Sequence, residues 1–278
     1  MPSEITAVFF DLDETLIPDE PAFEEALHET CGEVEKAHGV PREKLGQSVE
    51  LAGRRLWKEF DEERGLARRL GISATEGLWG KFETGENPNI KALCAFAPGY
   101  RKRAWHEALR EHGVDDAALA GRLAVRFMEA RRKPARCAPF PDSRPVLEAL
   151  KKNFRLGAIS NGAVDLQREK FAASGLEKFF EAIVISAELD VGKPEAGIFE
   201  AAMKKLDSEP AGSVMVGDSL VRDIAGARGV GMKAVWINRF GKGIPDGEPI
   251  RPSERELERQ KPDLEISDLS PLPSWLGA

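Results

Sequence analysis

The spacing of hydrophobic positions changes twice along this chain of 278 residues. A short apolar run at residues 5–10 ends in the acidic turn Asp11-Leu12-Asp13-Glu14, a pattern typical of a buried parallel strand that leads into a functional loop. From about residue 17 to residue 139, apolar residues recur every three or four positions, which predicts amphipathic helices. After Pro139, short apolar runs alternate with helical spacing.

The middle block reads as a mainly helical domain, residues 18–138, inserted after the first strand. Helical spacing is clearest at residues 23–34, 49–60, 105–112 and 120–130. Residues 71–98 are rich in glycine and proline, so we expect loops with short helices there, and residues 93–96 are a strand candidate.

The remainder, residues 1–17 and 139–278, predicts an α/β core. Strands are expected at residues 155–160, 182–186, 213–216, 233–237 and 264–266. Helices are expected between them, the first capped by Asp142, and residues 241–247 form a glycine-rich loop. This alternation predicts a Rossmann-like parallel sheet that is covered on both faces.

Composition narrows the class of protein. Hydrophobic residues make up 42% and charged residues 31%, as in ordinary globular domains. The net charge of −7 argues against a nucleic-acid partner, and no apolar run approaches the roughly 20 residues of a membrane helix. Cys31, Cys94 and Cys137 are too scattered for a zinc site or a disulfide framework. The first residues lack signal-peptide features, so we expect a cytoplasmic protein. We expect it to act on a small molecule as a monomer or homodimer.

Polar residues suited to chemistry follow four of the predicted strands. Ligands of open parallel sheets bind outside the carboxyl ends of the strands, so we expect these residues to meet in one site. They are Asp11 and Asp13, then Ser160 and Asn161, then Lys193, and finally Asp218 and Asp223.

The acidic members of this set predict a magnesium-dependent reaction. Asp11, Asp13 and Asp218 would repel one another in one pocket, and Mg²⁺, which prefers oxygen ligands, would relieve that repulsion. Asp11 could then attack phosphorus as a carboxylate nucleophile. Asp13 could give a proton to the leaving oxygen and later take one from water.

The other members suit the binding of a phosphoryl group. Lys193 offers a point charge to the phosphoryl oxygens and tempers the charge of Asp11. Ser160 and the amide of Asn161 can donate hydrogen bonds to the same oxygens. Asp223 is expected to anchor either a metal-bound water or Lys193.

Four motifs resemble those of the haloacid dehalogenase superfamily, in the same order. They are Phe10-Asp11-Leu12-Asp13-Glu14-Thr15-Leu16, Ser160-Asn161-Gly162, Gly192-Lys193-Pro194 and Gly217-Asp218-Ser219-Leu220-Val221-Arg222-Asp223. The resemblance covers the whole chain and is clearest outside the helical block. It implies a Rossmann-like core with a helical cap, Asp11 as nucleophile and Asp13 as acid/base. It also implies a metal held by the Asp11 carboxylate, the Asp13 backbone carbonyl and Asp218.

The second aspartate of the first motif decides between chemistries within this resemblance. Dehalogenases of the superfamily lack it, because a halide leaving group needs no proton. Since Asp13 is present, we expect a phosphatase that cleaves a small phosphomonoester (a sugar phosphate, a nucleotide or a short acid phosphate) through an aspartyl-phosphate. The stretches at Asn161 and at Trp236-Ile237-Asn238, together with Trp105, are similar to the branch of N-acylneuraminate-9-phosphate phosphatase and small nucleotidases. The alternatives are a phosphomutase, a non-catalytic binder of phosphorylated metabolites and a 2-haloacid dehalogenase.

Three basic clusters lie in the helical block, and we expect each to be a solvated face rather than a substrate clamp. They are Arg54-Arg55 with Lys58, Arg101-Lys102-Arg103, and Arg131-Arg132-Lys133 with Arg136.

Overall fold

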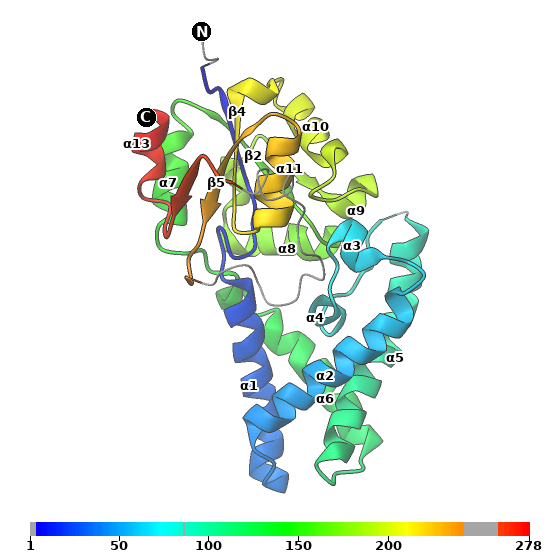
Figure 1. The fold of residues 1–278 in the computed structure, drawn as a ribbon. Coiled ribbons are helices and arrows are strands. Elements are labelled where there is room, and N and C mark those ends of the chain that lie inside the picture. The colour runs from blue at the N-terminus through cyan, green and yellow to red at the C-terminus, as the bar shows by residue number, and fades with distance from the viewer. Residues whose placement is uncertain (1–3, 86, 242–260) are drawn as a thin grey trace. The chain divides into compact units, whose positions relative to one another are not determined.

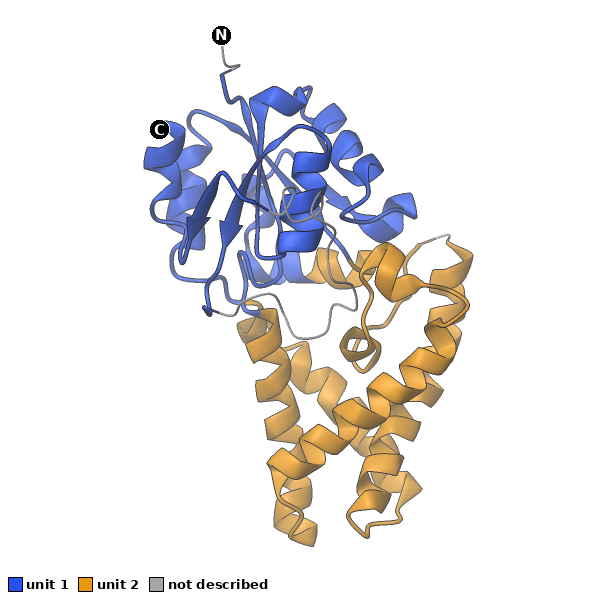
Figure 2. Ribbon diagram, in the orientation of Figure 1, with its two compact units in different colours: residues 1–18, 138–161, 170–278 blue, residues 19–137, 162–169 orange. Residues whose placement is uncertain are grey.

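The computed structural model describes residues 4–85, 87–241 and 261–278. The chain forms two compact units, coloured separately in Figure 2. The first comprises residues 1–18, 138–161 and 170–278, and the second comprises residues 19–137 and 162–169. The glycine-rich stretch at 241–247 lies outside the described residues except for Gly241.

The first unit is built on a six-stranded parallel sheet with the order β3-β2-β1-β4-β5-β6 (Figure 1). Its strands are β1 (Ala7–Phe10), β2 (Arg155–Ser160), β3 (Ala182–Ile185), β4 (Ser213–Gly217), β5 (Lys233–Ile237) and β6 (Leu264–Ile266). The predicted α/β fold class is confirmed. The strand order runs outward in both directions from β1 and β4, so the switch point, where such sheets bind ligands, lies between these two strands.

Helices cover both faces of this sheet. The described residues of the unit form helices α7 (Ser143–Leu150), α9 (Ser186–Leu189), α10 (Ala196–Lys205), α11 (Ala225–Gly229) and α13 (Leu272–Leu276), together with residues 170–174 of α8 (Val164–Ser174). Phe10 packs with α7 and α13 in one apolar cluster, whereas its neighbour Phe9 packs with α10 and α11 in another. Successive strand residues point to opposite faces, so β1 contributes to both cores.

The described residues of the second unit form helices, turns and loops, and none of them forms a strand. It contains α1 (Asp19–His38), α2 (Arg42–Asp61), α3 (Leu66–Leu70), α4 (Ala74–Gly77), α5 (Pro88–Glu111) and α6 (Ala117–Arg131). None of the helices in the described parts of the chain is both long and apolar enough to span a membrane.

Helix α5 corrects one expectation. Residues 88–98 form its first half, so the strand candidate at 93–96 was wrong. The Asn87 side chain accepts a hydrogen bond from the Asn89 N–H at 2.8 Å, and Pro88 occupies the first turn, where proline is favoured. Buried Ile90 and Leu93 recur at helical spacing, and this packing outweighs the backbone hydrogen bond lost at Pro98.

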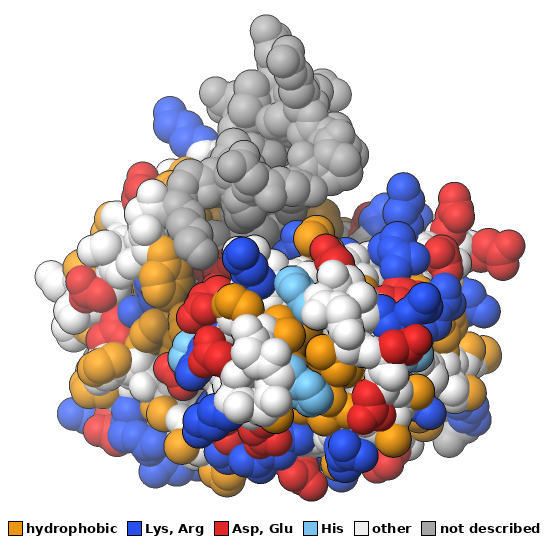
Figure 3. All heavy atoms as spheres, turned by 90° about the horizontal axis from the view of Figure 1, so that it is seen from below, with side chains coloured by type: hydrophobic (Ala, Val, Ile, Leu, Met, Phe, Trp, Pro, Cys, Tyr) orange, Lys and Arg blue, Asp and Glu red, His pale blue; other side chains and the backbone are white. Residues whose placement is uncertain are grey.

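Two arginines of the basic clusters are buried, so a solvated face was wrong for them. Arg101 donates to the carbonyls of Gly77, at 2.9 Å, and Gly80. Arg131, with 1% of its surface exposed, pairs with Asp19 and lies over the Trp79 ring. On the face of the molecule shown in Figure 3, exposed acidic and basic side chains are interspersed, without one large patch of a single sign.

Asp142 also differs from its expected role. It stands at the N-cap position of α7, but its side chain makes no capping hydrogen bond. Its two carboxylate oxygens instead accept hydrogen bonds from Arg239 at 3.1 Å, and one of them also accepts the N–H of Leu269. The Asp142 side chain therefore links the start of α7 to Arg239 and Leu269 and does not cap the helix.

Candidate active site

Asp11 is positioned by the central pair of strands. It follows β1 directly, and its N–H donates to the Val216 carbonyl of β4 at 2.9 Å. Beyond it the chain turns back on itself, since the Glu14 N–H donates to the Ile17 carbonyl at 2.8 Å and Glu14 has a φ of 56°. Asp13 therefore lies at the start of a tight turn, while Asp11 is held by the sheet and is only 7% exposed.

A buried lysine links Asp11 to a second carboxylate. The Lys193 Nζ lies 2.6 Å from Asp11 Oδ1 and 2.7 Å from Asp223 Oδ1, and 3% of the lysine side chain is exposed. Of the two expected anchoring roles for Asp223, the structure therefore shows the contact with Lys193. With both partners buried, the ammonium has a fixed position between two negative charges.

Asn161 fixes the backbone of this lysine. Its side-chain Oδ1 accepts the Lys193 N–H at 2.8 Å, and its Nδ2 donates to the Lys193 carbonyl at 2.9 Å. The Asn161 side chain is thus occupied by Lys193 rather than turned entirely to a ligand. Ser160, the last residue of β2, is buried next to it.

Three carboxylates gather at the switch point. Asp11, Asp218 and Asp223 each place one carboxylate oxygen within 4.8 Å of the others. Asp223 lies in a π-helical turn, Leu220–Ile224, and its Oδ2 accepts the Ser219 N–H at 3.0 Å. The Asp218 carbonyl accepts a hydrogen bond from Trp236 Nε1 at 2.8 Å.

The pKa values of Asp11 and Asp218 are raised, so the nearby Lys193 does not fully compensate their negative charges. Burial raises the pKa of Asp11 to about 7 against the opposing effect of Lys193, and Asp223 and Asp13 raise it further. Burial, with Asp11 and Asp223 nearby, also raises the pKa of Asp218. Burial acts to lower the pKa of Lys193, but its contacts with Asp11 and Asp223 outweigh that effect and raise it.

This donor set fits Mg²⁺. Its ligand atoms are carboxylate oxygens, which hard dications prefer. A dication would stabilise the charged forms of Asp11 and Asp218, whose pKa values are raised by burial and by the neighbouring carboxylates. Asp11 and Asp218 could hold the ion through their carboxylates. The backbone carbonyl of Asp13 is the third expected ligand, while the side chain of Asp13 turns to a different partner.

That partner is Lys170 of α8, a residue that the sequence analysis missed. Its Nζ donates to both Asp13 oxygens, at 2.9 and 3.0 Å. Gln167, Lys170 and Ser174 follow helical spacing and are all buried. Polar residues repeated on the buried side of a helix were the signal that could have revealed this contact.

Comparison with known proteins agrees with this geometry. A model of the haloacid dehalogenase-like hydrolase family matches residues 5–231. Phosphoserine phosphatase of Thermus thermophilus is 33% identical over 94% of this chain and 95% of its own length. N-acylneuraminate-9-phosphatase of Mus musculus is 31% identical over 86% of this chain and 85% of its own.

The same fold occurs in a solved structure with a different chemistry in its name. A 2-haloacid dehalogenase from Pseudomonas syringae is 27% identical, covers 98% of both chains and has a TM-score of 0.57. The two sequence relatives above, both at least 31% identical, are nevertheless named phosphatases, which confirms the expected enzyme class. The expected superfamily is also confirmed: this chain belongs to the haloacid dehalogenase-like hydrolase family.

Proposed function

We propose that this enzyme hydrolyses a small phosphomonoester, with Mg²⁺, through an aspartyl-phosphate formed on Asp11. One observation carries the proposal: the buried Lys193 ammonium contacts Asp11 in a chain that also keeps Asp13 two residues later. A halide displacement has no use for Asp13, whereas cleavage of an ester needs an acid for the departing oxygen.

In the first half of the reaction, an Asp11 carboxylate oxygen bonds to phosphorus while the bond from phosphorus to the ester oxygen breaks. Asp13 gives its proton to the departing oxygen, which leaves as an alcohol. Lys193 and Ser160 donate to the phosphoryl oxygens, where charge develops. Asn161 contributes by fixing the Lys193 backbone.

In the second half, a water oxygen bonds to phosphorus and Asp13 takes up the proton that the water loses. The bond between phosphorus and the Asp11 oxygen breaks, which restores the carboxylate and releases phosphate. Bound Mg²⁺, held by Asp11, Asp218 and the Asp13 carbonyl, would supply positive charge that offsets the repulsion between carboxylate and phosphate. Asp223 supports the site by holding Lys193.

The relatives support the substrate class. The names phosphoserine phosphatase and N-acylneuraminate-9-phosphatase both denote phosphatases of small phosphorylated metabolites. The substrate we propose is accordingly a sugar phosphate, a nucleotide or a short acid phosphate.

Phosphate release from a panel of such esters tests the proposal. Asp11→Asn should lose about three orders of magnitude or more of activity, as expected when a covalent nucleophile is removed. Asp115→Asn, at an exposed position of the helical unit, is the matched control and should keep wild-type activity. EDTA should abolish turnover and added Mg²⁺ should restore it. Full activity of Asp11→Asn would show that the nucleophile is another group.

The same experiments separate the alternatives. A phosphomutase would convert one phosphosugar into its isomer without releasing phosphate. A dehalogenase would release halide from a 2-haloacid, and a non-catalytic binder would bind a phosphorylated ligand without turnover.

A further inference from the structure

Lys170 is a buried charge in the core unit. Only 2% of its side chain is exposed, and its Nζ donates to both oxygens of Asp13. The lysine comes from α8, whose next residue, Phe171, is fully buried in the apolar cluster on one face of the sheet. A lysine taken out of water in this way costs free energy unless a charged partner compensates it, and Asp13 provides that compensation.

The two ends of this contact differ in how firmly they are held. Lys170 is fixed by the helix and by its burial. Asp13 belongs to a turn, just before Glu14 with its φ of 56°, and 28% of its side chain is exposed. A carboxyl group in such a turn has several accessible orientations, so the contact with Lys170 selects one of them.

We infer that Lys170 is a positioning residue: it holds the Asp13 carboxyl in the orientation that proton transfer to the leaving oxygen requires. The inference rests on the function proposed above. Both oxygens of Asp13 face the ammonium, so one can carry the transferable proton while the other still accepts from Lys170. After the proton has passed to the ester oxygen, the resulting carboxylate regains both contacts.

This role makes a prediction about leaving groups. An alkyl phosphate releases a strongly basic alkoxide oxygen, which needs the Asp13 proton as the ester bond breaks. A nitrophenyl phosphate releases a weakly basic phenolate, which leaves without that proton. Loss of positioning should therefore slow alkyl esters far more than nitrophenyl esters, whereas a general disturbance of the fold would slow both.

The experiment compares kcat and KM on an alkyl phosphate and on p-nitrophenyl phosphate for full-length variants with Mg²⁺. Lys170→Met should lower kcat on the alkyl ester by about 10- to 100-fold and on p-nitrophenyl phosphate by less than about threefold, with KM nearly unchanged. Asp13→Asn should show the same selectivity with a larger loss. Adding Lys170→Met to Asp13→Asn should change kcat little further, because both changes act through one carboxyl group.

Arg228→Met is the matched control, since it removes a different cation–carboxylate contact, with Asp263, from the same unit. It should leave the ratio of the two rates unchanged. Lys170→Arg, which keeps the charge, should recover part of the alkyl-ester rate, and it serves as the second variant if Lys170→Met does not fold by circular dichroism.

The outcomes of this experiment are distinct. If Lys170→Met keeps the wild-type ratio of rates, or turns over the alkyl ester faster than wild type, Lys170 does not position Asp13 for catalysis. If the wild-type protein releases no phosphate from any ester, the proposed function itself has failed.

Discussion

At the scale of single residues, Gly217 makes the charge arrangement around Asp11 possible. It is the last residue of β4, and a Cβ atom there would lie only 2.3 Å from Cγ of Asp223. Asp223 in turn holds Lys193, whose ammonium contacts Asp11. The glycine at position 217 thus leaves room for the Asp223 carboxylate to pair with Lys193, which in turn contacts Asp11, the proposed nucleophile.

Gly217→Ala should therefore impair catalysis more than folding. The added methyl group would displace the Asp223 carboxylate and with it Lys193, and a shift of about 1 Å at a reacting group costs on the order of 100-fold in rate. We expect kcat for phosphate release to fall at least about tenfold. Gly229→Ala is the control, because nothing lies within 4 Å of a Cβ atom there, and its kcat should equal that of wild type. Equal rates for Gly217→Ala and wild type would show that Asp223 can move without cost.

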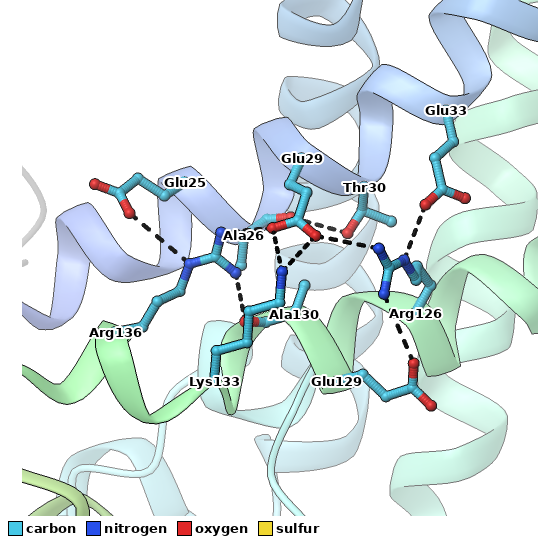
Figure 4. A network of polar contacts seen from close by, with 10 residues as sticks. All are labelled: Glu25, Ala26, Glu29, Thr30, Glu33, Arg126, Glu129, Ala130, Lys133 and Arg136. Atoms are coloured by element: carbon cyan, nitrogen blue, oxygen red, sulfur yellow. Dashed lines mark hydrogen bonds and ion pairs between the residues drawn. The ribbon is translucent and has the colours of Figure 1, made fainter.

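At the scale of elements, ion pairs join α1 to α6 and to the following 3₁₀ turn, Pro134–Cys137 (Figure 4). Glu29 of α1 accepts hydrogen bonds from Lys133 and Arg136 at 2.7 to 2.9 Å, and Arg126 of α6 bridges Glu29 and Glu33. These contacts lower the pKa of Glu29 to about 2. The basic cluster at the end of α6 is therefore engaged within the helical unit.

The pH dependence of stability should report this network. Because the folded pKa of Glu29 lies below its ordinary value of 4.5, its contribution is fully present above pH 4.5 and is lost as pH falls toward 2. Glu29 is partly solvated, so Glu29→Gln should lower the free energy of unfolding by only about 1 kcal/mol at pH 6. Urea denaturation should show that difference shrinking at pH 3. Glu129→Gln, which removes one exposed contact at 3.9 Å, should show a smaller effect at pH 6.

Arg239 joins three segments of the core unit in a similar way. Its guanidinium pairs with Asp142 in front of α7 and donates to the Thr15 carbonyl in the turn after Asp11, at 2.8 and 3.0 Å. It also lies 3.9 Å from the centre of the Phe140 ring. Both partners of the ion pair are largely buried, at 7% and 15% exposure.

Removal of this arginine should destabilise the core unit. Arg239→Met leaves Asp142 and the Thr15 carbonyl without the guanidinium, and the free energy of unfolding should fall by about 2–3 kcal/mol. The matched variant Arg228→Met breaks a more exposed pair and should cost less than about 1 kcal/mol. Urea titrations followed by circular dichroism measure both, and equal losses would contradict the assignment of Arg239.

At the scale of the whole molecule, local patterns predicted the strands and the motif residues at their ends. The six strands and the meeting of Asp11, Lys193, Asp218 and Asp223 follow from apolar runs and from the geometry of parallel sheets. The contacts that the sequence did not reveal join positions far apart in the chain. The spacing of polar residues along α8 could indicate that Lys170 is buried, but it does not identify Asp13, 157 positions away, as its partner.

Two other misses have related causes. Helix α5 passes through Pro98, so a local breaker signal was overridden by tertiary packing along the helix. Asp142 looked like a helix cap because the preference for aspartate at that position is local, whereas its actual partner, Arg239, lies 97 positions away. Local preference failed where a long-range contact determined the outcome.

Metal binding should be visible in the stability of the whole chain. The pKa of Asp11 is raised to about 7, so ionising it in the folded protein lowers stability as pH rises from 3.8 through about 7. The pKa of Asp218 is also raised, so its ionisation lowers stability in the same direction. Mg²⁺ at 100 times its dissociation constant would add about 2.7 kcal/mol, which corresponds to a rise in Tm of about 5–10 °C.

Asp218→Asn tests whether the carboxylates cause this behaviour. In EDTA at pH 8 it should melt above the wild type, because one of the mutually repelling charges is gone, and that advantage should shrink at pH 5. Its Tm should respond much less to Mg²⁺, since one ligand of the ion is lost. Asp115→Asn, exposed and in the helical unit, should follow wild type in both respects. If Asp218→Asn responds to Mg²⁺ as strongly as wild type, the ion binds elsewhere, because removing a ligand from the switch-point cluster must weaken binding there.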